Sequence, residues 1–201
     1  MRLTRLLGSF GAVAATALFL GGCVATTPLT PSDFVGQSRV VDEALNGSVV
    51  VFSPFVRQPS PHPDVYRLDV RLIAAIDRRS GEARYSVEQV VEHRLGSWTM
   101  PRRARYLNGQ GDLVSARWFD RDRGDVTCGG AGSCLYVETS RFGVVRTDVA
   151  ALAGNVDRWQ LRVEADRANF DAAIDARSVR AFYESVEFRA AKMASARARG
   201  G

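Results

Sequence analysis

Cys128 and Cys134 are the pair of residues in this sequence that is best placed for covalent chemistry. The five residues between them, Gly129 to Ser133, are all small and can form a tight turn, so two strands that meet there would bring the sulfurs together. We therefore predict a disulfide, which requires an oxidising compartment. A metal-binding pair and a redox-active dithiol are the alternatives, although a Cys-x-x-Cys spacing would favour either of them and no histidine is nearby.

Cys23 stands at the end of an N-terminal segment that is typical of exported proteins. Arg2 and Arg5 supply positive charge, and the apolar run from Leu6 to Leu20 has the length of a secretory signal and is short for a membrane span. The segment ends in Leu20-Gly21-Gly22-Cys23, which resembles the lipobox of bacterial lipoproteins. This resemblance implies cleavage before Cys23, a diacylglyceryl group on its thiol, and acylation of the new amine, as with palmitate. An ordinary signal peptide with a chance cysteine is the alternative.

The lipobox resemblance also implies a location. Val24, and not Asp, follows the cysteine, which by analogy with enteric lipoprotein sorting favours the outer membrane, with the protein facing the periplasm. We expect residues 1–22 to be the signal peptide, residues 23–47 to be the lipidated cysteine and its tether, and residues 48–201 to be one β-rich domain. Within the tether, a short helix is predicted around Val40 to Leu45.

The two histidines give little support for catalysis. His62 lies between two prolines and is expected to be solvated, whereas His93 falls among the apolar positions of a predicted strand, where a lone histidine is usually structural. The sequence contains neither a Gly-x-Ser-x-Gly elbow in the mature chain nor a phosphate-binding loop. We therefore expect no catalytic residue, no cofactor and no metal ligand, and a protein that is not an enzyme.

Three aspartates, Asp120, Asp122 and Asp125, have a spacing that suggests a calcium-binding loop. The twelfth position of such a loop needs an acidic ligand, but here it is Ala131, and arginines lie between the carboxylates. We therefore interpret the run as a solvated turn between strands.

Strands with alternating apolar residues must position these groups. Residues 64–77 and 83–95 alternate with a period of two on either side of a short turn, which predicts a β-hairpin. Glu88 and Glu92 share the polar face of its second strand, where we expect them to meet arginines. Other strands are predicted at residues 49–52, 113–120, 134–145, 159–163 and 170–174, and a short helix at residues 147–153.

The whole pattern predicts an α+β fold that is mainly β. We expect an antiparallel sheet, as a sandwich or a partly open barrel, with a short helix and a C-terminal amphipathic helix. The chain has 201 residues, 46% of them hydrophobic, and a net charge of +5. This composition excludes a disordered chain and a protein that crosses the membrane many times.

A second resemblance covers Leu113 to Val186. The runs Arg123-Gly-Asp-Val-Thr-Cys128 and Cys134-Leu-Tyr-Val-Glu138, followed by a short helix, a strand and a final Phe-Tyr helix, are similar to a group of uncharacterised proteobacterial envelope proteins. This resemblance implies a disulfide hairpin and no particular activity.

The C-terminal helix offers a candidate interaction surface. Phe188 lies about 180° from the apolar Val179 on a helix of 3.6 residues per turn. With Arg189 and Lys192 it would face an envelope protein or an anionic lipid surface. The alternative is that the helix packs on the sheet and Phe188 touches a loop.

These observations together lead us to expect a lipid-anchored cell-envelope protein with a binding or structural role. A hydrolase acting on envelope polymers and an accessory of outer-membrane assembly are the alternatives. The expected partners are the membrane, through the lipid, and an envelope protein. Nucleic acid is not expected because export separates the chain from it, and the sequence leaves the oligomeric state open.

Overall fold

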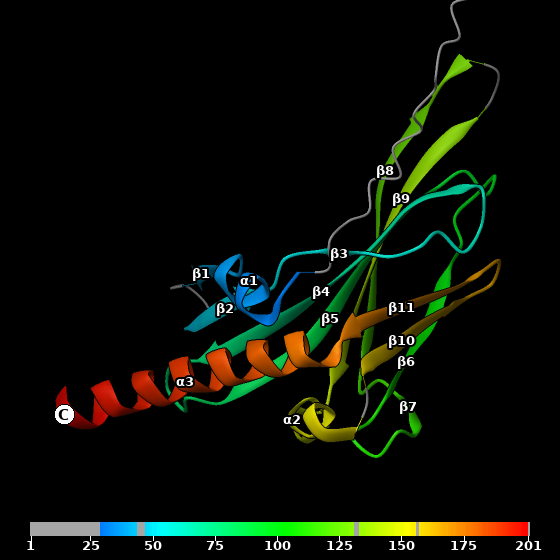
Figure 1. The fold of residues 1–201 in the computed structure, drawn as a ribbon. Coiled ribbons are helices and arrows are strands. Elements are labelled where there is room, and N and C mark those ends of the chain that lie inside the picture. The colour runs from blue at the N-terminus through cyan, green and yellow to red at the C-terminus, as the bar shows by residue number, and fades with distance from the viewer. Residues whose placement is uncertain (1–28, 44–46, 131–132, 156, 201) are drawn as a thin grey trace, which may run out of the picture.

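A broad antiparallel sheet, called the main sheet below, organises the molecule (Figure 1). The computed structural model describes residues 29–43, 47–130, 133–155 and 157–200. The main sheet has the strand order β1-β2-β4-β5-β9-β8, and a two-residue strand, β3, also pairs with β4. Its strands are β1 (Arg39–Glu43), β2 (Ser48–Phe52), β3 (Val56–Arg57), β4 (Val65–Asp77), β5 (Ala83–His93), β8 (Phe119–Cys128) and β9 (Cys134–Val144).

A smaller antiparallel sheet packs on one face of the main sheet, which we call its inner face. The strand order of this smaller sheet is β11-β10-β6-β7. Its strands are β6 (Pro101–Leu107), β7 (Leu113–Ser115), β10 (Arg158–Ala165) and β11 (Asn169–Asp175). The buried side chains of the two sheets belong to one hydrophobic core, so the fold is mainly β and its sheets do not close into a barrel.

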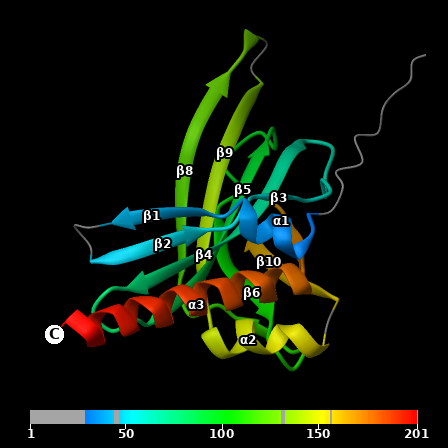
Figure 2. The same cartoon turned by 60° about the vertical axis from the view of Figure 1, so that its left-hand side comes forward.

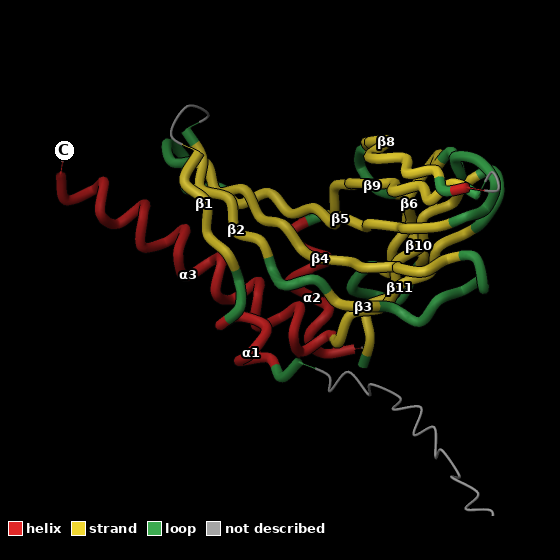
Figure 3. The backbone as a smooth tube through the Cα atoms, turned by 90° about the horizontal axis from the view of Figure 1, so that it is seen from above, coloured by secondary structure: helices red, strands yellow, loops and turns green. Residues whose placement is uncertain are grey.

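Three helices of the described chain, α1 (Pro31–Gly36), α2 (Arg146–Asn155) and α3 (Ala176–Gly200), lie on the same side of the main sheet (Figure 3). Thr30 and Asp33 form a capping box that begins α1. The Asp175 carboxylate accepts from the Ser178 amide and begins α3. None of the described helices combines the length and the apolar character that crossing a membrane requires.

The core lies between the inner face of the main sheet, the smaller sheet and α3. Alternate residues of β4 point into it, as the period of two predicts: Leu68, Val70, Leu72, Ala74 and Ile76. Trp159 of β10 is fully buried, meets the Tyr106 ring edge to face, and donates its indole hydrogen to the Leu107 carbonyl at 2.8 Å. Val179, Phe182 and Val186 supply the stripe of α3 that closes the core.

The structure confirms the mainly β fold class and the central hairpin, and it corrects three local predictions. The helix predicted around residues 40–45 is wrong, because Arg39–Glu43 form strand β1, paired with β2; residues 44–46 lie outside the described residues. The solvated turn predicted for the three aspartates is also wrong, because they lie on β8. The single strand predicted at residues 113–120 is wrong as well, because Leu113–Ser115 form β7 of the smaller sheet and Phe119 begins β8 of the main sheet. Strand β6 was not predicted at all.

The segment expected to be a tether therefore holds ordered structure in its second half. The Phe34 side chain is buried and meets Phe182 of α3 edge to face, with 6.3 Å between the ring centroids. Strand β1 adds an outer strand to the main sheet in register with β2. Helix α1 and strand β1 thus pack on the domain that was predicted to begin at residue 48.

Candidate functional site

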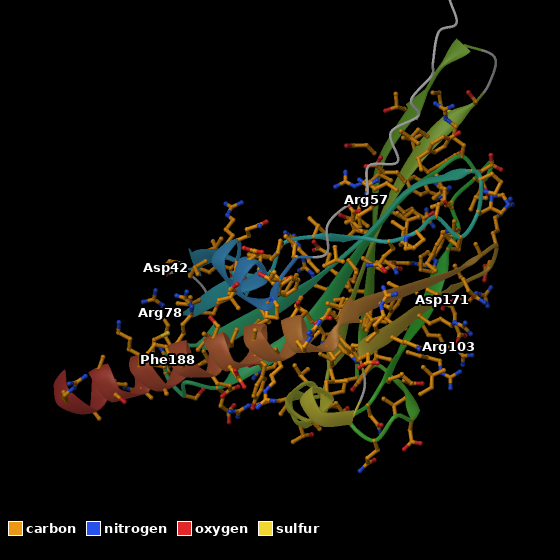
Figure 4. The ribbon with its side chains drawn as sticks, viewed as in Figure 1. Asp42, Arg57, Arg78, Arg103, Asp171 and Phe188 are labelled. Carbon is orange, nitrogen blue, oxygen red and sulfur yellow. A yellow bond between two sulfur atoms is a disulfide. The ribbon has the colours of Figure 1, made fainter. Side chains whose placement is uncertain are left out.

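The outer face of the main sheet, which points away from α3, carries a network of arginines and carboxylates. Asp69 of β4 lies between Arg57 and Arg67, with both Nε–Oδ distances at 2.5 Å (Arg57 is labelled in Figure 4). Arg67 also reaches the Glu92 carboxylate at 2.9 Å. The predicted pairing of Glu92 with an arginine is therefore confirmed.

A second group of ion pairs lies beside the first. Glu88 of β5 pairs with Arg71 on one side and with Arg141 on the other, the latter at 2.6 Å. The Arg71 guanidinium also stacks on two aromatic rings, 4.6 Å from the Phe52 centroid and 4.4 Å from that of Phe55. The prediction that Glu88 meets arginines is confirmed, but the side chain is buried, at 4% exposed, and not on an open surface.

The strand register turns the second group into a ladder of alternating charge. Across β4, β5, β9 and β8, the directly opposed residues are Arg71, Glu88, Arg141 and Asp120. Strand β8 is the edge of the sheet, so the ladder ends there in a carboxylate. Cross-strand pairs of opposite charge stabilise a sheet, which explains why so polar a segment as β8 is a strand.

A hollow of about 320 Å³ lies over the end of this ladder. Its lining is almost wholly polar: Glu88, Asp120, Asp122, Thr139 and Arg141. Because the Glu88 oxygens are already bound by two arginines, the aspartates and the Thr139 hydroxyl are the groups that face an incoming ligand. In the described part of the chain, no set of three or more His, Cys, Asp or Glu side chains is arranged to hold a metal ion. The hollow suits a positively charged side chain or amine.

A larger cleft, of about 700 Å³, opens on the other side of β8, against β6. Arg102 and Asp166 form an ion pair on its wall, and Arg121 donates to the Pro101 carbonyl at 3.1 Å across it. The remaining lining comes from Met100, Phe119 and Asp120. The hollow and the cleft thus share Asp120 and lie on opposite sides of β8.

His93 and Glu138 form an enclosed polar pair on the inner face of the main sheet. The distance from His93 Nε2 to Glu138 Oε1 is 2.9 Å, and the two side chains are 0% and 4% exposed. The Thr99 amide and hydroxyl both donate to the same carboxylate. The Leu95 amide donates to His93 Nδ1 at 3.3 Å, which assigns the ring hydrogen to Nε2. The sequence suggested a boundary histidine, but the structure buries it completely.

The environment of Glu138 favours its ionised form. Burial by itself raises the pKa of this carboxyl, but the hydrogen bonds from His93 and Thr99 outweigh it, so the pKa lies below its ordinary value of 4.5. In the described chain, neither nitrogen of His93 contacts a Ser, Thr or Cys side chain, because Thr99 bonds to Glu138 instead. The hydrogen bonds from Thr99 and Leu95 hold both side chains in fixed positions within the core.

The structure confirms the disulfide between Cys128 and Cys134. The two residues face each other in the register of β8 and β9, at the end of a hairpin that projects past the rest of the domain (Figure 2). Residues 120–130 are all exposed. The bond therefore closes a solvated arm and does not join parts of the core.

Replacement of both cysteines by serine is expected to loosen this arm alone. A loop this short gives about 2 kcal/mol of stabilisation in the chain-entropy model, or about a thirtyfold change in the local opening equilibrium. Hydrogen exchange of the amides at the hairpin end should accelerate by about that factor. Amides of the β4–β5 hairpin are the internal control, and faster exchange there would contradict a local role.

The remaining predicted residues fall in two places. Phe188, Arg189 and Lys192 are exposed on α3, with Phe188 at 72% (Figure 4). The predicted partner surface is thus exposed to solvent in the described structure. That a partner binds to it remains a prediction. The predicted lipidation site, Cys23, lies outside the described residues.

Sequence reasoning missed the His93–Glu138 pair because it left open which face of β9 points inward. Leu135 and Val137 suggested one face as the apolar one, but Glu138, Ser140 and Phe142 face the core. The buried Phe142 was the available signal. In comparisons with known proteins, no family model, curated protein or solved structure matches this chain.

Proposed function

We propose that this chain is a lipid-anchored protein of the cell envelope, held in the outer membrane on its periplasmic side, with a binding or structural role. The observation that carries the proposal is the motif Leu20-Gly21-Gly22-Cys23 after a basic and apolar N-terminal segment. The disulfide supports it, because such bonds persist in oxidising compartments such as the periplasm. Two or three acyl chains on one residue are enough for firm attachment.

The outer face of the main sheet is the binding surface that we assign to this role. Its arginines and carboxylates hold one another in fixed positions, and the ladder ends in Asp120, which lines the open hollow together with Asp122. Charges that are held in fixed positions determine which partner binds, because the partner must present opposite charges at matching positions. A partner with basic side chains would extend the alternation of charge beyond the sheet edge.

Intact-mass measurement of the native protein tests the anchor. We expect a chain that begins at Cys23 and carries acyl groups, with the other two thiols oxidised. Cys23→Ser is expected to abolish cleavage and acylation, because the sulfur that receives the lipid is missing. The variant with serine at 128 and 134 is the matched control and should keep both modifications. An unprocessed N-terminus without an acyl adduct in the wild-type protein would refute the proposal.

The same envelopes, crosslinked before extraction, test the binding surface. Asp122→Arg reverses one exposed charge in the hollow and breaks no ion pair of the described structure. A species that is crosslinked to the wild-type protein and lost in this variant would identify the partner of the outer face. An unchanged crosslinking pattern would remove the hollow from the proposed function.

A further inference from the structure

The second half of α3 presents a stripe that no other element of the described chain covers. At 100° per residue, Phe188, Lys192, Ser195 and Arg199 fall within a narrow arc opposite the buried Val179. All four are exposed. The opposite side of the same stretch faces the β4–β5 turn, where the Arg197 guanidinium donates to the Arg79 carbonyl. We refer to these four residues as the α3 stripe.

The charge of this half of α3 is not compensated within the domain. Residues 188–200 contain three arginines and one lysine and no acidic residue. The two carboxylates of α3 are already used, since Glu184 pairs with Arg180, and Glu187 with Arg146 of α2. Among the described residues, Arg189 and Lys192 have no ion-pair partner, and Arg197 and Arg199 contact only backbone carbonyls.

Helix stability explains only part of this basic run. Cations near a helix C-terminus interact favourably with the helix dipole, but the effect falls off within the last turn. Arg197 and Arg199 satisfy that description, whereas Lys192 lies two turns earlier. The dipole also gives no reason for a phenylalanine that is 72% exposed in the same stripe.

The N-terminal end of the described chain places the helix that carries this stripe close to the predicted anchor. The chain enters the fold at Leu29 and continues into α1, which packs on α3 through Phe34 and Phe182. Six peptide units separate Leu29 from Cys23, and at about 3.5 Å each they span at most about 20 Å. A lipid on Cys23 would therefore keep the helical side of the domain close to the bilayer, whatever path those residues take.

We propose that the α3 stripe rests on anionic phospholipid headgroups of the membrane that holds the Cys23 lipid. This inference depends on the proposed function, because the anchor supplies the proximity. Lys192 and Arg199, with Arg189 beside them, supply the charge, and Phe188 enters the boundary between headgroups and acyl chains. The contact directs the helices toward the membrane and the ionic outer face of the main sheet into the periplasm, where a partner can reach it.

The contact sets the orientation of the domain and does not hold the protein on the membrane. Two or three acyl chains already attach the protein firmly. Each cation close to an anionic surface adds only about a fivefold factor, which membrane fractionation of an acylated protein would not reveal. The test must therefore measure how the domain lies on the bilayer.

A single thiol on the stripe supplies that measurement. With Cys23 acylated and the other two cysteines paired, Ser195→Cys carries the only free thiol of the mature chain. The purified acylated protein is reconstituted into vesicles of neutral phosphatidylcholine, or of the same lipid with phosphatidylglycerol, and reacted with a bulky membrane-impermeant maleimide. We expect the reaction to be at least about tenfold slower on the anionic vesicles, and we expect high salt to remove the difference.

Two variants complete the experiment. In Ser195→Cys combined with Lys192→Glu and Arg199→Glu, protection should be lost while thermal stability falls only slightly, since both side chains are exposed and only the favourable charge of Arg199 at the helix end is reversed. Arg84→Cys, which is exposed on the outer face of the main sheet, should react equally fast on both vesicles. Equal rates for the Ser195→Cys thiol on both vesicles would overturn the inference. Protection in native envelopes but not on protein-free anionic vesicles would also overturn it, in favour of a protein partner.

The mass of the same preparation separates this inference from the proposed function. An acylated protein with an unprotected stripe would leave the anchor standing and remove the headgroup contact. An unacylated protein would remove the anchor and, with it, the proximity on which the headgroup contact depends.

Discussion

Replacement of Glu138 by Ala is expected to lower the free energy of unfolding by about 3 kcal/mol or more, because each buried donor that is left without an acceptor costs about 1–3 kcal/mol. The change leaves three buried donors without an acceptor: the His93 Nε2 hydrogen, the Thr99 amide and the Thr99 hydroxyl. A domain of this kind has a total stability of roughly 5–15 kcal/mol. Urea-induced unfolding at pH 7 would measure the loss.

Glu138→Gln is the matched control, because its amide can satisfy the same three groups. Its oxygen can accept from His93 and from the Thr99 amide, while its nitrogen donates to a Thr99 hydroxyl that has reversed its role. We therefore expect a loss of about 1 kcal/mol or less. If the Ala and Gln variants were equally stable, the hydrogen bonds of Glu138 would not be what stabilises this part of the core.

The two variants also differ from the wild-type protein in their response to acid. Because the pKa of Glu138 is lower in the folded state than its ordinary value of 4.5, the unfolded chain takes up this proton first as the pH falls. The stabilisation by this carboxylate is complete above that value and is lost as the pH falls through the folded pKa. Below about pH 4.5 the stability of the wild-type protein should therefore fall more steeply than that of Glu138→Gln.

The buried pair shows where reasoning from the sequence alone stops. A period of two correctly placed His93 on the inner face of its strand and Glu88 on the outer face, since alternation is a local property. Which carboxylate meets the histidine depends on how β5 pairs with β9, forty-five residues further along the chain. The register between two such distant strands is set by the whole sheet, so it cannot be predicted from the sequence of either strand alone.

The same limit explains the strands that were missed or misread. The β4–β5 hairpin was predicted because both strands are long, alternate cleanly and flank a short turn. Strand β8 has no apolar alternation, so its charged residues predicted a turn. In the structure they form a strand because β9 pairs with them and places Arg141 opposite Asp120. In β6, the buried apolar residues are Pro101, Ala104 and Tyr106, and two arginines follow the proline. Tertiary pairing outweighs local propensity in both strands.

Phe34→Ala is expected to destabilise the domain by about 3–5 kcal/mol, the usual cost of emptying a buried phenylalanine site. The ring is 1% exposed and forms the contact between α1 and α3. The matched control is Phe188→Ala, the same chemical change at a side chain that is 72% exposed, for which we expect less than about 0.5 kcal/mol. Thermal or urea unfolding compares the two, and similar losses would mean that α1 is not part of the folded domain.

The docking of α1 also decides how freely the domain can move above its anchor. With α1 packed on α3, the chain between Cys23 and the domain ends at Leu29, whereas release of α1 would move that end to β1, at Arg39. Sixteen peptide units span up to about 55 Å, against about 20 Å for six. In the vesicle experiment, Phe34→Ala should therefore weaken the protection of the Ser195→Cys thiol although it changes no charge. Full protection with α1 released would show that the α3 stripe binds the bilayer without help from a short tether.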